Sequence, residues 1–308
     1  MSALKLGIVG FGAIARGQHL QAIAARAEFE LVAIADPALP RADVPAYPDL
    51  EAMLAAHPEI AAVSMCQPPR YRHSAARVAL EAGCHVMLEK PPSLSCEEGR
   101  ELLEFARARR TALLAAWHSR AAAAVPQARQ WLEGATIRSI AIEWKEDVRR
   151  WHPGQQWIWE QGGFGVFDPG INALSILTEI VAGPVSFRSA ELELPANRAM
   201  PIAARMVMAG VSGFPIRAVF DWRQSGPQTW NIVCETDRGV LALTDGGNRL
   251  TIGGTSVPVP PEAEYTTLYR RFAELAIRGG SDVDLEPLRL AAQALSEGAV
   301  LPTDPFED

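Results

Sequence analysis

The feature that most constrains this chain is a glycine turn near its beginning. An apolar run over Leu6–Gly10 leads into Gly10-Phe11-Gly12-Ala13-Ile14-Ala15, and a helical pattern covers Ala13–Arg26. Gly10 permits a tight turn, Gly12 lets a pyrophosphate approach the backbone, and Ala15 allows close packing of helix on strand. The helix N-terminus adds oriented N–H groups. A strand–turn–helix joint needs glycine for steric reasons alone, but the order of these elements predicts a dinucleotide-binding turn.

The residues that follow alternate short apolar runs with helical patterns, which is typical of βαβ units on a parallel sheet. The predicted strands are Leu6–Gly10, Leu31–Ala35, Ala61–Cys66, His85–Glu89 and Leu113–Ala116. The predicted helices are Ala13–Arg26, Leu50–Ala56, His73–Ala82 and Ser95–Arg109. Ser95 and Glu98 have the spacing of a capping box at the start of the last helix.

The pattern changes near residue 120, where longer alternating strands begin to dominate. The predicted strands are Thr136–Val148, Val185–Leu194, Ala203–Val211, Pro215–Trp222, Thr229–Thr236 and Gly239–Leu243. The predicted helices are Ala121–Leu132, Pro169–Val181, Tyr265–Ile277 and Leu285–Leu295. The fold class is therefore α/β. We expect an N-terminal Rossmann domain with a parallel sheet over residues 1–120, and a C-terminal α+β domain with a large, open, mostly antiparallel sheet over residues 121–308.

Composition removes several classes of function. The formal charge of −7 offers no electrostatic footprint for nucleic acid or for an acidic membrane surface. No apolar run is long enough to span a membrane, and the N-terminus lacks the pattern of a secretory signal. The four cysteines are scattered, so we expect reduced thiols in the cytoplasm, with no disulfide and no metal. They are Cys66, Cys84, Cys96 and Cys234.

Asp36 bears on the choice of cofactor. It ends the second predicted strand, where a carboxylate can accept hydrogen bonds from the hydroxyls of an adenosine ribose. A carboxylate there repels a 2′-phosphate, so the site favours NAD over NADP. Arg41 lies close enough along the chain to leave NADP open. The alternative is that Asp36 only starts the turn at Pro37.

Glu89-Lys90-Pro91-Pro92 follows the fourth predicted strand at the carboxyl edge of the sheet, where ligands bind in doubly wound folds. A lysine at this place would lie over a nicotinamide ring. There it could hydrogen-bond a reacting hydroxyl and relay or stabilise its proton. Lys90 is therefore a predicted catalytic and substrate-binding residue.

Taken together, these motifs resemble the glucose–fructose oxidoreductase/inositol dehydrogenase (Gfo/Idh/MocA) family. The resemblance covers the whole chain, and is strongest to the family's branch of bacterial aldose 1-dehydrogenases. The stretches that carry it are the glycine turn, His85–Pro92, Ala116–Arg120, Trp144–Trp159 and Phe167–Leu174. The resemblance implies a set of cofactor-binding residues. They are Gly10, Phe11, Gly12, Ala13, Ile14, Asp36, Cys66, Gln67, Pro68, His73, Glu89 and Lys90.

The family usually pairs the lysine with an aspartate and, four residues later, a histidine. This chain keeps Asp168 but has Asn172 where the histidine would be, and an asparagine cannot act as a base near neutral pH. The resemblance therefore implies that Asp168 and Lys90 remove the proton while Asn172 orients the substrate. Asp168 before Pro169 also has the form of a helix N-cap, and capping alone would be the simpler role.

The stretch Trp144–Trp159 suits a pyranose, because it combines aromatic faces with groups that bind hydroxyls. Several of its tryptophans could instead be core. Glu146 ends an otherwise apolar strand face and needs a partner, for which we expect a sugar hydroxyl. The predicted substrate-binding residues are Lys90, His118, Glu146, Trp151, His152, Asp168, Asn172 and Trp230.

These features predict an NAD-dependent aldose 1-dehydrogenase that acts on L-arabinose, D-galactose or both and releases an aldonolactone. A dehydrogenase of an inositol, a sugar acid or another sugar-like alcohol is the alternative within the same fold. A regulator that binds NAD without turnover is the alternative from another class, but Lys90 and Asp168 argue against it. We expect a homodimer, and a monomer is the alternative.

Overall fold

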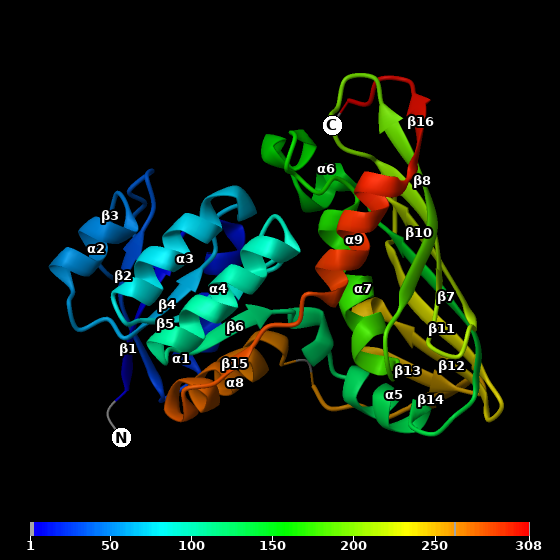
Figure 1. The fold of residues 1–308 in the computed structure, drawn as a ribbon, viewed down its shortest axis with the longest axis horizontal. Coiled ribbons are helices and arrows are strands. Elements are labelled where there is room, and N and C mark those ends of the chain that lie inside the picture. Colours follow the sequence, from blue (N-terminus) through cyan, green and yellow to red (C-terminus); the bar gives the residue numbers. More distant parts are fainter. Residues whose placement is uncertain (1–2, 262, 308) are drawn as a thin grey trace. The chain divides into compact units, whose positions relative to one another are not determined.

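A computed structural model describes residues 3–261 and 263–307 of the chain. The chain forms two compact units (Figure 1). The first contains the residues up to 118 together with 265–285, and the second contains 119–264 together with the residues from 286 onward.

The first unit is built on a parallel sheet. Within the described residues this sheet has seven strands in the order β15-β6-β5-β4-β1-β2-β3, which contains the strand order of a doubly wound dinucleotide-binding fold. Their bounds are β1 (Leu4–Val9), β2 (Phe29–Ala35), β3 (Ala46–Tyr47), β4 (Ala62–Met65), β5 (His85–Glu89), β6 (Leu113–Ala116) and β15 (Ser281–Asp282). The predicted parallel sheet is confirmed, and β3 and β15 are short edge strands that the apolar pattern did not reveal.

Helices cover both faces of this sheet. One face packs against α1 (Leu20–Ala24) and α8 (Glu264–Arg278), and the other against α2 (Leu50–Ala56), α3 (Arg72–Glu81) and α4 (Cys96–Arg109). The strands are buried on both faces, which is why they appear in the sequence as continuous apolar runs. Ser95 caps α4 as predicted, because its Oγ accepts the N–H of Glu98 at 3.2 Å.

The helix α8 corrects the expected division of the chain, which assigned residues 121–308 to the second domain. Tyr269 and Phe272 of α8 are fully buried, in the same core cluster as Leu6 and Ile8 of β1. Burial of these aromatic rings ties α8 to the first unit.

The second unit is built on a larger sheet of mixed direction. Within the described residues its order is β14-β13-β12-β11-β7-β10-β9-β8-β16, and all neighbours are antiparallel except β10 with β7 and β16 with β8. Their bounds are β7 (Ile137–Lys145), β8 (Ser186–Pro195), β9 (Ala203–Ala209), β10 (Pro215–Asp221), β11 (Thr229–Thr236), β12 (Gly239–Thr244), β13 (Arg249–Ile252), β14 (Thr255–Val257) and β16 (Ala299–Thr303). The predicted open, mostly antiparallel sheet is confirmed.

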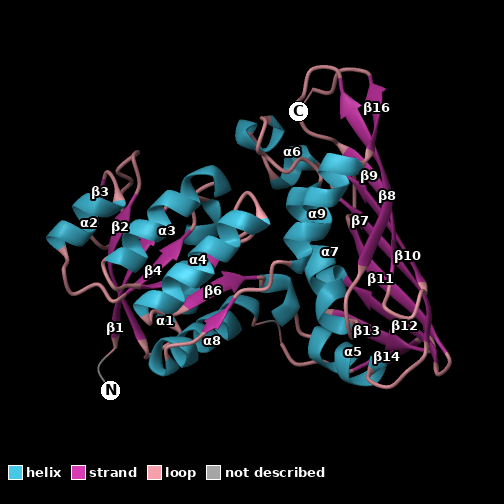
Figure 2. Ribbon diagram, in the orientation of Figure 1, coloured by secondary structure: helices cyan, strands magenta, loops and turns pink. Residues whose placement is uncertain are grey.

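The helices of the second unit lie along one face of its sheet (Figure 2). They are α5 (Val125–Leu132), α7 (Phe167–Ile180) and α9 (Glu286–Glu297). The single turn α6 (Val148–Trp151) and the 3₁₀ turn η4 (Gln156–Trp159) follow β7. Ile140, Ile142 and Trp144 of β7 are buried and alternate with more exposed residues, as expected for a sheet covered on one face.

The helix predicted over Ala13–Arg26 is confirmed over most of its length, and it contains a π-helical segment, η1 (Ala15–His19), before α1. One local prediction was wrong. Asp168 is not an N-cap, because α7 begins one residue earlier and its N-cap is Val166. Pro169 still lies in the first turn, where its missing N–H costs nothing, so the proline signal placed the start of α7 within about one turn.

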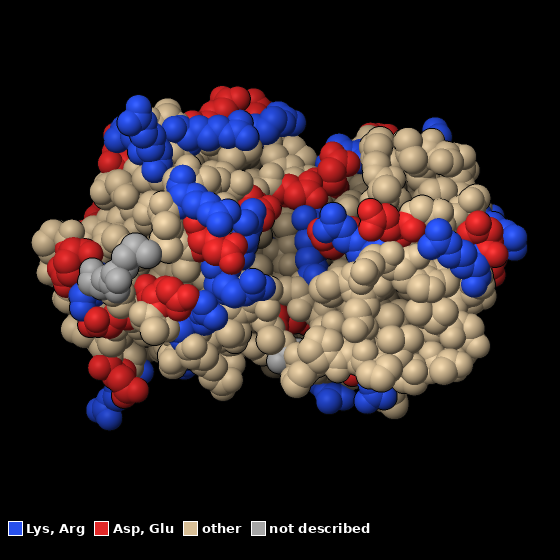
Figure 3. Space-filling model, turned by 90° about the horizontal axis from the view of Figure 1, so that it is seen from below, with Lys and Arg blue, Asp and Glu red and all other residues tan. Residues whose placement is uncertain are grey.

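Lys and Arg side chains are interspersed with Asp and Glu on the face that Figure 3 presents. Over residues 3–261 and 263–307, no helix is both long and apolar enough to cross a membrane.

Candidate active site

The two glycines of the turn after β1 differ in the space around them. Gly10 has φ +84°, and a Cβ there would lie 2.5 Å from the backbone nitrogen of Gln67. Gly12 is exposed, and a Cβ there would meet no atom within 4 Å. Gly10 is thus required by the fold itself, whereas Gly12 leaves its space open to a ligand. This is the arrangement that lets a pyrophosphate reach the N–H groups after β1.

Asp36 lies just beyond β2 and is tied to this turn. Its Oδ2 accepts the N–H of Phe11 at 2.7 Å, and its Oδ1 accepts the N–H of Ala38 at 2.9 Å. A carboxylate oxygen can accept more than one hydrogen bond, so these contacts orient the group and leave acceptor capacity for a ribose. The residues of the turn therefore fit NAD.

The other predicted cofactor residues lie in two places. Cys66, Gln67 and Pro68 follow β4 at the carboxyl edge of the sheet. His73 lies on α3 and pairs with Glu101 at 3.0 Å. That contact gives His73 a protein partner, and its cofactor role stays a prediction.

Lys90 directly follows β5, and a buried carboxylate stands beside it. Glu89 is 3% exposed. Its Oε2 accepts the backbone N–H of Lys90 at 2.9 Å, and its Oε1 accepts from Tyr265 at 2.7 Å and from His19 Nε2 at 2.9 Å. His19 continues the network to the hydroxyl of Tyr269, which also bonds to Ser64.

Electrostatics support a charged pair here. Burial alone would raise the pKa of Glu89, but the hydrogen bond and charge of His19, together with His118 and Tyr265, lower that pKa to about 2. Burial likewise opposes protonation of His19, yet electrostatic interactions with Cys66 and Tyr269 and the bond to Glu89 raise its pKa well above 6.5. Sequence reasoning missed His19, Tyr265 and Tyr269, because their partners lie on distant segments.

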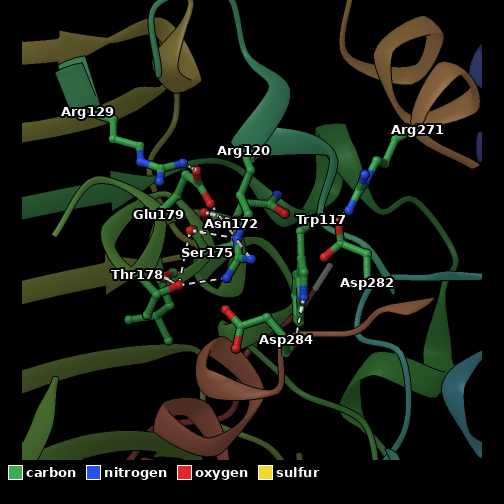
Figure 4. Close-up of polar contacts among 11 residues, drawn as sticks. Trp117, Arg120, Arg129, Asn172, Ser175, Thr178, Glu179, Arg271, Asp282 and Asp284 are labelled. Carbon is green, nitrogen blue, oxygen red and sulfur yellow. Dashed lines mark hydrogen bonds and ion pairs between the residues drawn. The ribbon is translucent and has the colours of Figure 1, made fainter. Parts of the chain in front are cut away.

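His118 and Trp117 follow β6 in the same unit. The His118 ring is half-buried and stacks on Tyr265, with ring centroids 5.4 Å apart. Trp117 Nε1 donates to the carbonyl of Asp284 at 2.8 Å (Figure 4). Trp117 is therefore fixed in the structure, while His118 keeps part of its surface open to a ligand.

In the second unit, His152 lies between two buried carboxylates. Its Nε2 is 3.6 Å from Glu146 Oε1 and 3.7 Å from Asp168 Oδ2. Glu146 is 4% exposed and Asp168 3%. Three of the predicted substrate residues, which lie just after β7, just after α6 and in the first turn of α7, are thus brought together.

Glu146 has the hydrogen-bond donors that a buried carboxylate needs, and they come from two tryptophans. Its Oε2 accepts the indole N–H of Trp230 at 2.8 Å, and its Oε1 lies 3.4 Å from the donor Nε1 of Trp222. The Trp230 ring is stacked with Trp144 and lies beside Trp151, with centroids 5.9 and 5.3 Å away. Two indole N–H groups within the protein thus bind Glu146, and its predicted contact with a sugar hydroxyl stays a prediction.

Asn172 lies one turn after Asp168 on α7 and is half-buried. The helix is held by Arg120, which donates from Nε to the carbonyl of Ser175 at 3.1 Å and from Nη2 to Thr178 Oγ1 at 2.8 Å (Figure 4). These contacts fix α7, and with it the positions of Asp168 and Asn172.

A dinucleotide turn and a lysine at the carboxyl edge of the same parallel sheet are what a nicotinamide-dependent oxidoreductase needs in its cofactor domain. The protein is of that class. Among the described residues, no group of three or more His, Cys, Asp or Glu side chains is placed to hold a metal ion.

Comparisons with known proteins identify the family. Residues 4–116 match the oxidoreductase family with an NAD-binding Rossmann fold, the Gfo/Idh/MocA family. The chain is 41% identical to galactose 1-dehydrogenase of Pseudomonas fluorescens over 308 residues, which is all of both chains. The crystal structure of D-galactose-1-dehydrogenase from Rhizobium etli matches with a TM-score of 0.95 and 50% identity, over 100% of this chain and 99% of that one.

A 3-ketoreductase from Actinomadura kijaniata shares the fold, with a TM-score of 0.85 and 19% identity over 98% of this chain and 99% of that one. The chain belongs to the Gfo/Idh/MocA family, and the resemblance seen in its motifs is confirmed.

Proposed function

We propose that this enzyme oxidises the anomeric carbon of D-galactose to the aldonolactone, with NAD as the hydride acceptor. The observation that carries the proposal is the full-length likeness to two galactose 1-dehydrogenases, at 41% and 50% identity. L-arabinose shares the configuration of D-galactose around most of the ring, so we expect some turnover of that sugar too.

The second unit supplies surfaces that suit a pyranose. The rings of Trp151 and Trp230 can cover the apolar C–H face of the sugar, while His152, Glu146 and Asp168 offer donors and acceptors for its hydroxyl rim. Asn172 adds an amide that can both donate and accept, which fits a role in orienting the substrate.

The reaction breaks two bonds at the anomeric centre. Bound NAD supplies the acceptor for the hydride that leaves C1. The chain's own residues must take the proton from the O1 hydroxyl, so that the C1–O1 bond becomes a carbonyl. We assign the proton to Asp168, and we assign to Lys90 a hydrogen bond that stabilises the developing charge on O1. Asn172 cannot take the proton near neutral pH.

Asp36 favours NAD over NADP in this proposal. Its carboxylate is fixed beside the glycine turn by the N–H groups of Phe11 and Ala38. A 2′-phosphate would meet a negative charge that cannot swing away without losing both bonds.

The test measures NADH or NADPH formation by purified enzyme with D-galactose, L-arabinose, other aldoses, polyols, inositols and sugar acids. D-galactose with NAD should give the highest kcat/KM. Lys90→Met should lower kcat by at least about a hundredfold with little change in the Kd of NAD. Lys5→Met is the matched control, since Lys5 is only partly buried and pairs with Glu30 on the neighbouring strand.

Different failures have different meanings. Highest turnover of an inositol or a sugar acid would move the substrate class within the family. NAD binding without turnover of any sugar would favour the alternative that the protein is a regulator. A Lys90→Met variant as active as the Lys5→Met control would remove the assigned role of Lys90.

A further inference from the structure

The backbone on both sides of Lys90 is held by buried side chains from distant parts of the first unit. On one side, the Glu89 carboxylate accepts the Lys90 backbone N–H at 2.9 Å. On the other side, the guanidinium of Arg72 donates from Nη1 to the carbonyls of Glu89 and Pro91, the residues that flank Lys90. The peptide group that joins Glu89 to Lys90 and the carbonyl of Pro91, one residue beyond Lys90, are therefore both anchored.

Arg72 is built for this contact. It is 3% exposed and begins α3, and its Nη2 also donates to the carbonyl of Gln67 at 2.5 Å. A guanidinium has five donors in a planar fork, so one side chain can bind three carbonyls at fixed angles. Burial of a charge is costly, and hydrogen bonds of this kind offset that cost. Arg72 thus fixes the end of β5 relative to the loop after β4.

Glu89 is held just as firmly. Its Oε1 accepts from His19 Nε2 at 2.9 Å and from Tyr265 at 2.7 Å, so only Oε2 contacts Lys90. His19 ends the π-helical segment η1 that follows the glycine turn, and Tyr265 comes from α8. The carboxylate therefore connects the lysine to the cofactor turn and to a helix far along the chain.

We infer that Arg72 and the Glu89–His19–Tyr265 group are positioning residues that fix the backbone of Lys90 and thereby aim its amine at the reacting hydroxyl. We call these four residues the lysine clamp. The inference rests on the proposed role of Lys90 and adds the residues that hold Lys90 in place. None of the four is expected to touch the substrate, so weakening the clamp should lower kcat more than it raises KM.

Two mild variants test the two sides. Tyr265→Phe removes one hydrogen bond to Glu89 and keeps the ring that stacks on His118, whereas Arg72→Lys keeps the charge but loses the fork. Each should lower kcat for D-galactose by about tenfold, because small misplacements of a reacting group cost about that much or more. KM and the Kd of NAD should stay within about threefold of the wild type.

Thr111→Val is the matched control. It removes a buried hydroxyl in the same unit, whose Oγ1 donates to the carbonyl of Ala106 at 3.4 Å, away from Lys90. The control should lose thermal stability comparable to Tyr265→Phe while kcat is unchanged. If both clamp variants lose stability and keep kcat, the residues are merely structural and the inference is wrong.

A second readout does not depend on turnover. The chain has only three lysines, Lys5, Lys90 and Lys145. Reductive methylation with carbon-13 formaldehyde gives each a separate dimethylamine signal, and the Lys90 signal is assigned by its loss in Lys90→Arg. Both clamp variants should displace the Lys90 signal and leave those of Lys5 and Lys145 in place.

The two readouts separate the inference from the proposed function. If the wild type turns over no sugar, the proposed function fails, and the Lys90 signal still decides whether the clamp fixes this residue. An unmoved Lys90 signal in both variants would overturn the clamp, even in an active enzyme.

Discussion

The two glycines of the turn after β1 should respond in opposite ways to the addition of one methyl group. At Gly10, with φ +84°, an alanine would adopt a left-handed conformation that costs about 1–2 kcal/mol. Its Cβ would also lie 2.5 and 2.8 Å from the nitrogen and Cα of Gln67. Relief of such overlap costs a further 1–3 kcal/mol or so. The free energy of unfolding should therefore fall by about 2–5 kcal/mol in Gly10→Ala.

Gly12→Ala should leave the free protein intact. A Cβ at this position meets nothing within 4 Å, so the free energy of unfolding should stay within about 0.5 kcal/mol of the wild type. The methyl group would instead occupy the space through which a pyrophosphate approaches the backbone. An overpacking cost of about 1–3 kcal/mol corresponds to a Kd of NAD raised by about 5- to 150-fold.

Urea unfolding without cofactor and titration of NAD by fluorescence separate the two effects. The midpoint in urea should fall by about 1–2 M for Gly10→Ala and should not move for Gly12→Ala. Gly17→Ala is the control, because a Cβ there also meets nothing within 4 Å and it lies beyond the turn. If Gly12→Ala bound NAD as tightly as Gly17→Ala does, the assignment of this turn to the pyrophosphate would be refuted.

Three further predictions concern Asp36, Trp230 and the pair of Glu89 and His19. Asp36→Ala removes the carboxylate that opposes a 2′-phosphate, so the ratio of kcat/KM for NAD to that for NADP should fall at least about tenfold in parallel assays. Trp230→Phe deprives buried Glu146 of a donor 2.8 Å away, so stability should fall by about 1–3 kcal/mol in urea unfolding and KM for D-galactose should rise, with the Kd of NAD unchanged. The pKa of Glu89 is lowered from 4.5 to about 2 and that of His19 is raised above 6.5, so the stability from Glu89 is lost as pH falls from 4.5 towards 2 and that from His19 as pH rises above 6.5. Urea midpoints measured across this pH range should show both losses, and Glu89→Gln should flatten the acid side.

Local patterns in the sequence sufficed for most of the fold. The strands of the first unit are buried on both faces and appear as short apolar runs, and the strands of the second alternate, so each period indicated its own kind of sheet. The edge strands β3 and β15 have only two residues each and carry no period that a pattern could reveal. The placement of α8 depends on where Tyr269 and Phe272 are buried, which is a property of the whole unit rather than of the local sequence.

In the candidate site too, residues marked by a local pattern could be predicted, and residues that depend on distant contacts could not. Gly10, Asp36 and Lys90 could be proposed as site residues from the sequence because each of them ends or follows a recognisable apolar strand. His19 and Tyr265 could not be predicted from the sequence. Their role depends on hydrogen bonds to Glu89, which lies 70 and 176 residues away along the chain. Arg72 is similar, since its partners are carbonyls, which carry no signature in a sequence.

Glu146 shows how a correct physical premise can lead to an incomplete assignment. A buried carboxylate on an apolar strand face must have hydrogen-bond donors, and the donor expected for Glu146 was a sugar hydroxyl. The structure provides the N–H groups of Trp222 and Trp230, which are easy to overlook because tryptophan is usually counted as an apolar residue. These two bonds do not exhaust the acceptor sites of a carboxylate. Glu146 can therefore fix the orientation of Trp230, whose ring contacts Trp151, and still accept a sugar hydroxyl, so that one buried charge sets both the aromatic and the polar side of the proposed sugar site.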